Sequence, residues 1–222
     1  MMSDISRNIT RIREQVVRSC AVSGRDPESI TCVAATKGVR PERIREAFDH
    51  GIQHFGENRV QEAQHKIPSL GIDVVWHMIG HLQSNKVKDA VNLFDMIQSV
   101  DSLHVAQKIH DVSSHLGKKM PMLMEVNIGR EATKSGFMEE DVGEALKKIR
   151  ALECLDVQGL MTVAPFASNP EDIRPAFRKM KQLFDHLGGM TTLSMGMSHD
   201  YTVALEEGAN MIRIGRAIFG ER

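Results

Sequence analysis

The chain has 222 residues, 41% of them hydrophobic and 26% charged, so it is long enough to bury one substantial core and too short for two ordinary domains. Its 28 Lys and Arg against 29 Asp and Glu give a formal net charge of −1, which excludes a general field attracting nucleic acid or anionic lipid. The three cysteines, Cys20, Cys32 and Cys154, form no CxxC pair, which argues against a disulfide framework or a zinc site and fits a reducing compartment.

The predicted elements begin with a helix. Ile5, Ile9, Ile12 and Val16 recur at helical spacing after Ser3, a suitable N-cap, and place a leading helix within residues 1–24. Short apolar segments then alternate with helical ones to the end of the chain. Strands are expected at 30–35, 54–55, 74–79, 96–100, 122–127, 156–161, 191–195 and 211–214. Helices are expected at 41–50, 57–67, 84–90, 102–116, 139–152, 170–187 and 200–208.

Strands that alternate with helices indicate a parallel sheet. Eight such units after one helix predict a single (β/α)₈ TIM barrel over residues 1–222, and they fit an open doubly wound sheet less well. No linker or low-complexity tract divides the chain, so one α/β domain is expected. The second predicted strand is very short, and His77 interrupts the apolar run of the third.

The first strand is followed by a lysine. Lys37 comes after the apolar run at 30–36 and before Gly38, where a barrel strand delivers a side chain to the active-site end. A lysine leaving a buried strand can be partly desolvated, which favours the uncharged amine that forms a Schiff base with an aldehyde. Taken alone, Lys37 fits a solvated strand-end lysine better, because lysines are seldom buried.

The loops after the seventh and eighth strands have the residue types of a phosphate site, which recurs at this place in the fold. Gly196 and Gly215 permit close approach of the backbone, and Ser198 adds a hydroxyl donor. Each alone fits an ordinary turn, whereas their joint placement predicts a phosphate site.

An amine on the first strand and a phosphate site on the last two predict one ligand that carries both an aldehyde and a phosphate. Pyridoxal 5′-phosphate (PLP) fits this description. Arg213, facing inward from the eighth strand, is a candidate partner for the pyridine nitrogen, and as a permanent donor it would leave that nitrogen unprotonated. An ion pair in the barrel core is the alternative role for Arg213.

Several segments together resemble one known family, the pyridoxal-phosphate homeostasis proteins. The match runs nearly end to end in the same order, and its two longest strings are specific. The segments are ATK at 35–37, FGENRVQE at 55–62, WHMIGHLQSNK at 76–86, KSG at 134–136, GLM at 159–161, LSMGMS at 193–198 and RIG at 213–215.

The resemblance implies a barrel similar to the N-terminal domain of alanine racemase, without the second domain of that enzyme. It implies PLP held as an internal aldimine on Lys37, with Arg213 at the pyridine nitrogen. The expected cofactor-binding residues are Lys37, Asn58, Met197, Ser198, Arg213, Gly215 and Arg216. Arg216 departs from the small hydroxyl residue expected after RIG, so its contact is left open between charge, backbone N–H alone and a side chain in solvent.

Other candidates have competing interpretations. Asn58 is suited equally to a cofactor contact and to capping the next helix. Tyr201, the only tyrosine, is expected to pack at a helix start rather than serve as an acid or base. His77 and His81 stand four apart, but they flank a strand end, where this spacing does not place both on one face, so no metal site is expected. The polar stretch 129–136 is a candidate lid or a plain surface loop.

Racemisation needs acid and base groups on both faces of the cofactor, and the resemblance supplies Lys37 for one face only. We therefore expect no catalytic residues and a carrier role in vitamin B6 homeostasis, supplying PLP to PLP-dependent apo-enzymes. An amino-acid racemase-like enzyme is the alternative, and a sugar-phosphate aldolase using Lys37 is a third. No apolar run has membrane length, and we expect a cytoplasmic monomer or weak dimer that binds neither membranes nor nucleic acid.

Overall fold

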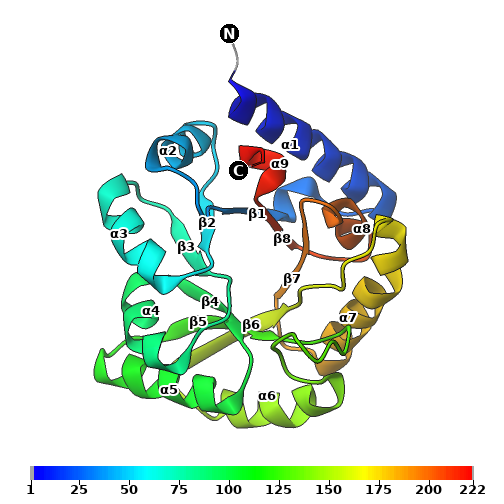
Figure 1. The fold of residues 1–222 in the computed structure, drawn as a ribbon. Helices are drawn as coiled ribbons and strands as arrows, with labels where there is room; N and C mark the ends of the chain where they lie inside the picture. The colour runs from blue at the N-terminus through cyan, green and yellow to red at the C-terminus, as the bar shows by residue number, and fades with distance from the viewer. Residues whose placement is uncertain (1–2, 222) are drawn as a thin grey trace.

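Eight parallel strands close into a barrel in sequential order, β1 pairing with both β2 and β8 (Figure 1). The structure is a computed structural model and describes residues 3–221, so residues 1, 2 and 222 of the predicted domain lie outside it. The predicted TIM barrel is confirmed. The strands are β1 (Thr31–Ala35), β2 (His54–Glu57), β3 (Val75–Met78), β4 (Met96–Val100), β5 (Met120–Glu125), β6 (Leu155–Met161), β7 (Thr192–Met197) and β8 (Met211–Ile214).

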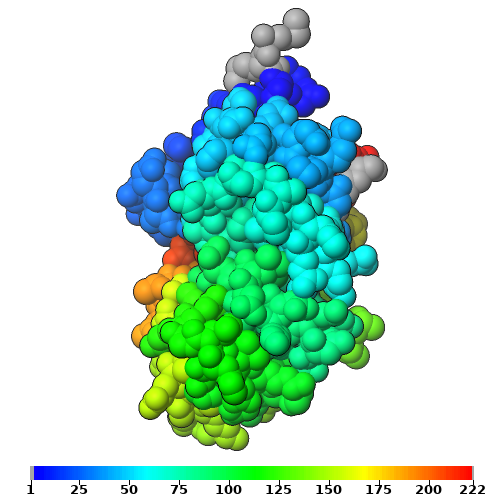
Figure 2. Space-filling model, turned by 90° about the vertical axis from the view of Figure 1, so that its left-hand side faces the viewer, coloured from blue at the N-terminus to red at the C-terminus, as the bar shows by residue number. Residues whose placement is uncertain are grey.

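Helices connect the strands and surround the barrel, as Figure 1 shows. The α-helices are α1 (Asp4–Ser23), α2 (Pro41–Asp49), α3 (Val60–Leu70), α4 (Val87–Leu93), α5 (Leu103–His115), α6 (Val142–Arg150), α7 (Arg174–Leu187), α8 (Tyr201–Glu206) and α9 (Arg216–Phe219). Short 3₁₀ turns are η1 (Pro27–Ser29), η2 (Ser84–Lys86), η3 (Glu139–Asp141) and η4 (Pro170–Ile173). Figure 2 shows the side on which α2, α3 and α4 form one continuous outer surface. Within residues 3–221, no helix has the length and apolar character that crossing a membrane requires.

Strand alternation divides the core into two layers. Outward side chains such as Phe55 and Trp76, whose ring centroids lie 5.4 Å apart, pack under the helices. Inward side chains form a second apolar cluster inside the barrel. The buried members of that inner cluster are Val33, Met96, Leu123, Met161 and Met211. This alternation also sends the residues that follow the strands toward the C-terminal mouth of the barrel.

Helix α1 lies beside the barrel as predicted from its apolar period. Its N-terminus is capped by Ser3, whose Oγ accepts a hydrogen bond from Ser6 N over 3.1 Å. Its apolar side is buried, and the helix contacts α2, α8 and α9. The buried residues of this side include Ile5, Ile9, Ile12, Val16 and Cys20.

The structure moves one predicted boundary that matters for the site. Glu57 was expected to begin a helix, but it is the last residue of β2, and α3 starts three residues later at Val60. The reason is that the Glu57 carboxylate has buried hydrogen-bond donors under the barrel wall, from Thr36 and Lys66. Helix α9, which follows Gly215, was not predicted because four residues show no helical period.

Candidate functional site

Lys37 lies at the C-terminal mouth of the barrel, two residues after the end of β1. It continues the inward series Thr31, Val33 and Ala35, and the chain then turns at Gly38, whose φ of 66° favours glycine. The Lys37 side chain is exposed. This exposure matches the solvated strand-end lysine and not the partly desolvated one, because Lys37 stands in the turn beyond the strand rather than within the barrel wall.

The peptide groups on both sides of Lys37 are held by a buried ionic cluster. Lys66 Nζ, from α3, donates to the Thr36 carbonyl over 2.8 Å, while Gly38 N donates to Glu62 Oε1 over 2.6 Å. The same ammonium donates to Glu57 Oε1 and Glu62 Oε1, each over 2.6 Å. A shift of the backbone that carries Lys37 would therefore break the hydrogen bonds of Thr36 and Gly38 to this ionic cluster.

Glu57 is fully buried in this cluster. Its Oε1 accepts from Lys66 and from Thr36 Oγ1, both over 2.6 Å. Burial raises the pKa of the Glu57 carboxyl, and the hydrogen bonds from Lys66 and Thr36 act against that rise. Glu57 therefore serves the barrel wall behind Lys37.

A cleft of about 610 Å³ opens beside Lys37. Its lining comes from the turns after β1, β2 and β3 and includes Asn58, Gly80, His81 and Lys86. The capping interpretation of Asn58 is wrong: the N-cap of α3 is Arg59, and no side chain caps that helix. Asn58 instead lies in the cleft with Lys37.

The predicted phosphate residues meet between β7 and β8. Ser198 Oγ accepts hydrogen bonds from Gly215 N and Ala217 N, each over 3.2 Å. Asp200 Oδ1 accepts from Met197 N over 2.6 Å and closes the turn that presents Ser198. A hydroxyl and two convergent N–H groups are the donors that a phosphate oxygen requires.

Gly196 allows this turn to lie close to α8. Its φ is 93°, and a Cβ placed there would lie 2.6 Å from the Cβ of Ala204. A side chain at this position is excluded by both backbone conformation and space. The turn of Ser198 therefore depends on a glycine at 196, as the sequence pattern indicated.

Gly215 and Lys37 follow neighbouring strands, β8 and β1, whereas Ser198 follows β7 on the other side of β8. Ala34 on β1 pairs with Ile214 on β8, and a Cβ on Gly215 would lie 3.4 Å from the Ala35 carbonyl oxygen. The turn that follows β8 is thus next to the strand that leads to Lys37.

Arg213 lies between these groups inside the barrel. Only 4% of it is exposed; its two terminal nitrogens donate to Ser194 Oγ over 2.6 Å and to the Thr162 carbonyl over 2.7 Å. Burial lowers the pKa of the Arg213 guanidinium to about 10, with Glu125 and Asp200 acting against this change, so it remains a cation at neutral pH. Among residues 3–221 no carboxylate accepts a hydrogen bond from Arg213, and Glu125 and Asp200 act on it only through their charges. The alternative role as one half of a core ion pair is therefore not what these residues show.

A half-buried carboxyl at the mouth was missed by the sequence reasoning. Glu125 ends β5, and burial raises its pKa to about 6; Asp101 raises it further, while Arg213 and His81 lower it. Its inward alternation with Leu123 was the available signal. Across the mouth, His81 Nδ1 pairs with Asp101 Oδ2 at 2.9 Å.

The remaining candidate residues lie at different positions in the barrel. Met197 is 36% exposed beside the phosphate turn, and Arg216 is exposed at the first position of α9. Tyr201 is 9% exposed within the outer core, which is the packing place expected for it. His77 bonds to residues inside the barrel, whereas His81 faces Asp101 at the mouth.

The polar loop at 129–136 is anchored across the mouth. Lys134 Nζ donates to the Ala164 carbonyl over 3.0 Å, and Ser135 Oγ lies 3.2 Å from His81 Nδ1. The amide of Asn127 donates to the Glu131 carbonyl over 2.9 Å. A role as a lid stays a prediction.

Comparison with known proteins gives one consistent result. A family model described as the alanine racemase N-terminal domain matches residues 3–222. A pyridoxal phosphate homeostasis protein of Aquifex aeolicus is 41% identical over 220 residues, covering 96% of each chain. Its counterpart in Escherichia coli K12 is 35% identical over 234 residues, covering 100% of this chain and 98% of the other.

Solved structures agree. PipY of Synechococcus elongatus, in a structure with PLP bound, superimposes with a TM-score of 0.86 at 32% identity, covering 97% of this chain and all of that one. Alanine racemase of Clostridium difficile superimposes with a TM-score of 0.72 at 18% identity, covering 95% of this chain and 56% of that one. The second likeness concerns the barrel fold alone.

Proposed function

The chain belongs to the family of pyridoxal phosphate homeostasis proteins, and from this membership we propose that it binds PLP and takes part in PLP homeostasis. One observation supports binding above all others: Lys37 and Gly215 follow the adjacent strands β1 and β8, and Gly215 N donates to the Ser198 hydroxyl that follows β7. PLP carries its aldehyde and its phosphate on neighbouring arms of one small ring. In this proposal a single PLP molecule spans the two protein groups.

Each group has a distinct task in this proposal. Lys37 holds the aldehyde carbon as a Schiff base, and the N–H groups of Gly215 and Ala217, with the Ser198 hydroxyl, hold the phosphate. Arg213 donates to the pyridine nitrogen and, because the guanidinium keeps its protons at neutral pH, leaves that nitrogen unprotonated. A ring without a proton on its nitrogen is a weak electron sink, which favours storage of the cofactor over turnover.

The carrier role is supported by the position of Tyr201, which does not lie opposite Lys37. A racemase needs a second acid or base opposite the lysine, and Tyr201 is packed in the outer core instead of at the mouth. We infer that the protein is a cytoplasmic monomer or weak dimer that holds PLP in protected form and supplies PLP-dependent apo-enzymes.

Borohydride reduction followed by peptide mapping tests the attachment. Incubation with PLP, reduction and digestion should give one pyridoxyl adduct, on Lys37. An adduct on Lys86, which lines the same cleft, or on Lys134, which crosses the mouth, would overturn the assignment.

A supply assay tests the carrier role. The PLP-loaded protein is mixed with an apo-transaminase in the presence of a phosphatase that destroys free PLP. Recovery of transaminase activity beyond that given by the same amount of free PLP supports protected delivery. Equal recovery from the two sources would contradict it.

A further inference from the structure

A continuous row of hydrogen-bonded side chains crosses the inside of the barrel from β2 to β8. His54 Nδ1 lies 3.0 Å from His77 Nε2, and His77 Nδ1 lies 3.0 Å from Gln98 Nε2. Gln98 Oε1 accepts from Ser194 Oγ over 2.7 Å, and Ser194 Oγ accepts from Arg213 over 2.6 Å. The row ends at the guanidinium proposed to face the pyridine nitrogen. We call these five residues the barrel row.

The direction of every bond in the barrel row follows from its last member. Arginine is a donor only, so the Ser194 oxygen accepts from Arg213, and its own proton goes to Gln98 Oε1. The Gln98 amide nitrogen then donates to His77 Nδ1. His77 consequently carries its proton on Nε2 and donates it to His54 Nδ1.

The environment keeps both histidines in the neutral form that this direction requires. His77 is 1% exposed and Gln98 and Ser194 are fully buried. Burial lowers the pKa of His77 to about 3, with His54 as a second cause, and burial also lowers the pKa of His54. A second contact fixes the Gln98 amide, which lies 3.2 Å from Met211 Sδ.

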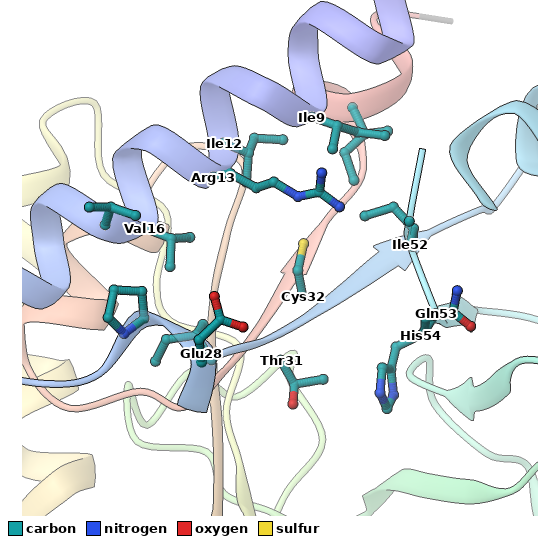
Figure 3. A pocket seen from close by; sticks show the side chains of 15 residues that line it. Ile9, Ile12, Arg13, Val16, Glu28, Thr31, Cys32, Ile52, Gln53 and His54 are labelled. Atoms are coloured by element: carbon teal, nitrogen blue, oxygen red, sulfur yellow. The ribbon is translucent and has the colours of Figure 1, made fainter. Parts of the chain in front are cut away.

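The far end of the barrel row lies at the N-terminal ends of β1 and β2. There His54 lines a cavity of about 440 Å³ between these strands and α1. In Figure 3 the His54 ring points away from α1, as Thr31 does, whereas Cys32 points toward the helix. The row thus spans the barrel from this cavity to the ligand end.

We propose that His54, His77, Gln98 and Ser194 are positioning residues that fix the guanidinium of Arg213 for its contact with the pyridine nitrogen. The inference rests on the proposed binding of PLP. It assigns these four residues a role toward the ligand although none of them touches it. The family resemblance and the sequence pattern had assigned them none.

The physical reason is that the orientation of each member depends on the next, although Gln98 also contacts Met211 and Arg213 also donates to the Thr162 carbonyl. Ser194 keeps a lone pair toward Arg213 because its hydroxyl proton is taken by Gln98. Gln98 presents its oxygen to Ser194 because its nitrogen is taken by His77. Without an acceptor at position 77, the Gln98 amide nitrogen keeps only the weak sulfur acceptor Met211 Sδ. The amide can then flip and place its nitrogen against the Ser194 hydroxyl, where it competes with Arg213 as a donor.

The test uses variants at three positions of the barrel row. Gln98→Leu removes the amide at similar size, and His77→Phe breaks the barrel row one step further from Arg213. Ser194→Ala removes the direct partner, and the double variant Gln98→Leu/Ser194→Ala completes a cycle. Ile97→Val is the matched control, since Ile97 is the buried neighbour of Gln98 on β4 but packs in the outer layer.

The first readout is the Nε–H signal of Arg213 in the nitrogen-15 NMR spectrum of the protein without PLP, assigned by its loss in Arg213→Lys. The second is the dissociation constant of PLP, followed by absorbance. We expect Gln98→Leu and His77→Phe each to shift or broaden the Arg213 signal and to weaken PLP binding about threefold to tenfold. Ile97→Val should change neither.

The double-mutant cycle distinguishes a positioning role of Gln98 from a general loss of stability. Once Ser194 is alanine, adding Gln98→Leu should weaken PLP binding by less than twofold more, because the only connection to Arg213 has already been cut. An unchanged Arg213 signal in both Gln98→Leu and His77→Phe, or fully multiplicative effects in the cycle, would overturn the proposal. If wild-type protein fails to bind PLP, the proposed function fails, while the Arg213 signal still decides whether the barrel row orients that side chain.

Discussion

The ammonium of Lys66 lies 2.6 Å from Glu57 Oε1 and 2.8 Å from the Thr36 carbonyl oxygen, directly behind the turn that carries Lys37. The second carboxylate oxygen, Glu57 Oε2, is buried without a partner among residues 3–221. The charge of Glu57 is therefore balanced mainly through one oxygen. This makes the pair sensitive to the loss of either member.

We expect Lys66→Met to lower the free energy of unfolding by about 3–5 kcal/mol, because it leaves a buried carboxylate without its cation. It should also weaken PLP binding, since the Thr36 carbonyl loses the donor that holds the segment before Lys37. Urea unfolding and a PLP titration measure the two effects. The exposed Lys88→Met on α4 is the control, and Glu57→Gln/Lys66→Met should regain part of the stability. A loss no larger than that of Lys88→Met would contradict the expectation.

Ser198→Ala should raise the dissociation constant of PLP about tenfold, because hydrogen bonds to a charged phosphate are among the stronger ones. Binding of pyridoxal, which lacks the phosphate, should be unchanged, and a parallel absorbance titration measures both. Arg216→Ala should change PLP affinity less than threefold, since the Arg216 side chain is exposed and only its place at the start of α9 is fixed. A larger effect of Arg216→Ala than of Ser198→Ala would show that charge, and not the turn, holds the phosphate.

Gly196→Ala should cost about 2–4 kcal/mol of stability, because it combines a left-handed backbone with a clash against Ala204. Gly24→Ala provides the comparison: its φ is 66°, but a Cβ there meets nothing within 4 Å, so only about 1–2 kcal/mol is expected. Thermal unfolding distinguishes them. Equal losses at both positions would mean that α8 gives way and that the close packing of the turn is unimportant.

The barrel row predicts a pH dependence. The pKa of His77 is lowered from 6.5 to about 3 in the folded protein, so between these values the unfolded chain binds a proton that the folded chain does not. The contribution of His77 to stability is therefore complete above pH 6.5 and is lost as pH falls toward 3. Urea unfolding of wild type and His77→Phe should show a difference that is constant above about pH 7 and shrinks on acidification. A difference that grows as pH falls would reverse the assigned sign.

Exchange at the Cα of an amino acid separates the carrier from a racemase. With single L-amino acids in deuterated water, the PLP-loaded protein should show neither Cα deuteration at turnover rates nor D-isomers by chiral chromatography. Glu125 is the group to examine if exchange occurs, because its carboxyl at the mouth has a pKa of about 6. Exchange abolished by Glu125→Gln would identify an enzyme and overturn the storage role.

Much of the fold followed from apolar period alone. β4 and β8 occupy the residues predicted for them, because their apolar runs are bounded by polar turns. β2 was predicted two residues short, since Gly56 and Glu57 are not apolar, and only the buried donors of Glu57 explain why the strand continues.

At the mouth of the barrel, single inward residues could be predicted from the sequence, but the contacts between them could not. Lys37 and Arg213 could be placed there because inward positions alternate along a strand, although their contacts with a ligand stay predictions. The barrel row could not, because it depends on the register between strands far apart in the sequence. His77 in the third strand resembled an interruption of the apolar run, and the structure shows it to be the central member of that row.

The place of Trp76 gives the molecule a built-in optical probe. It is the only tryptophan of the chain and packs against Phe55 in the outer layer, on the face of β3 opposite to His77. A cofactor that absorbs where indole emits would quench this residue by energy transfer through the barrel wall, without touching it. Loading and release are therefore open to observation by tryptophan emission in the unlabelled, unmodified protein.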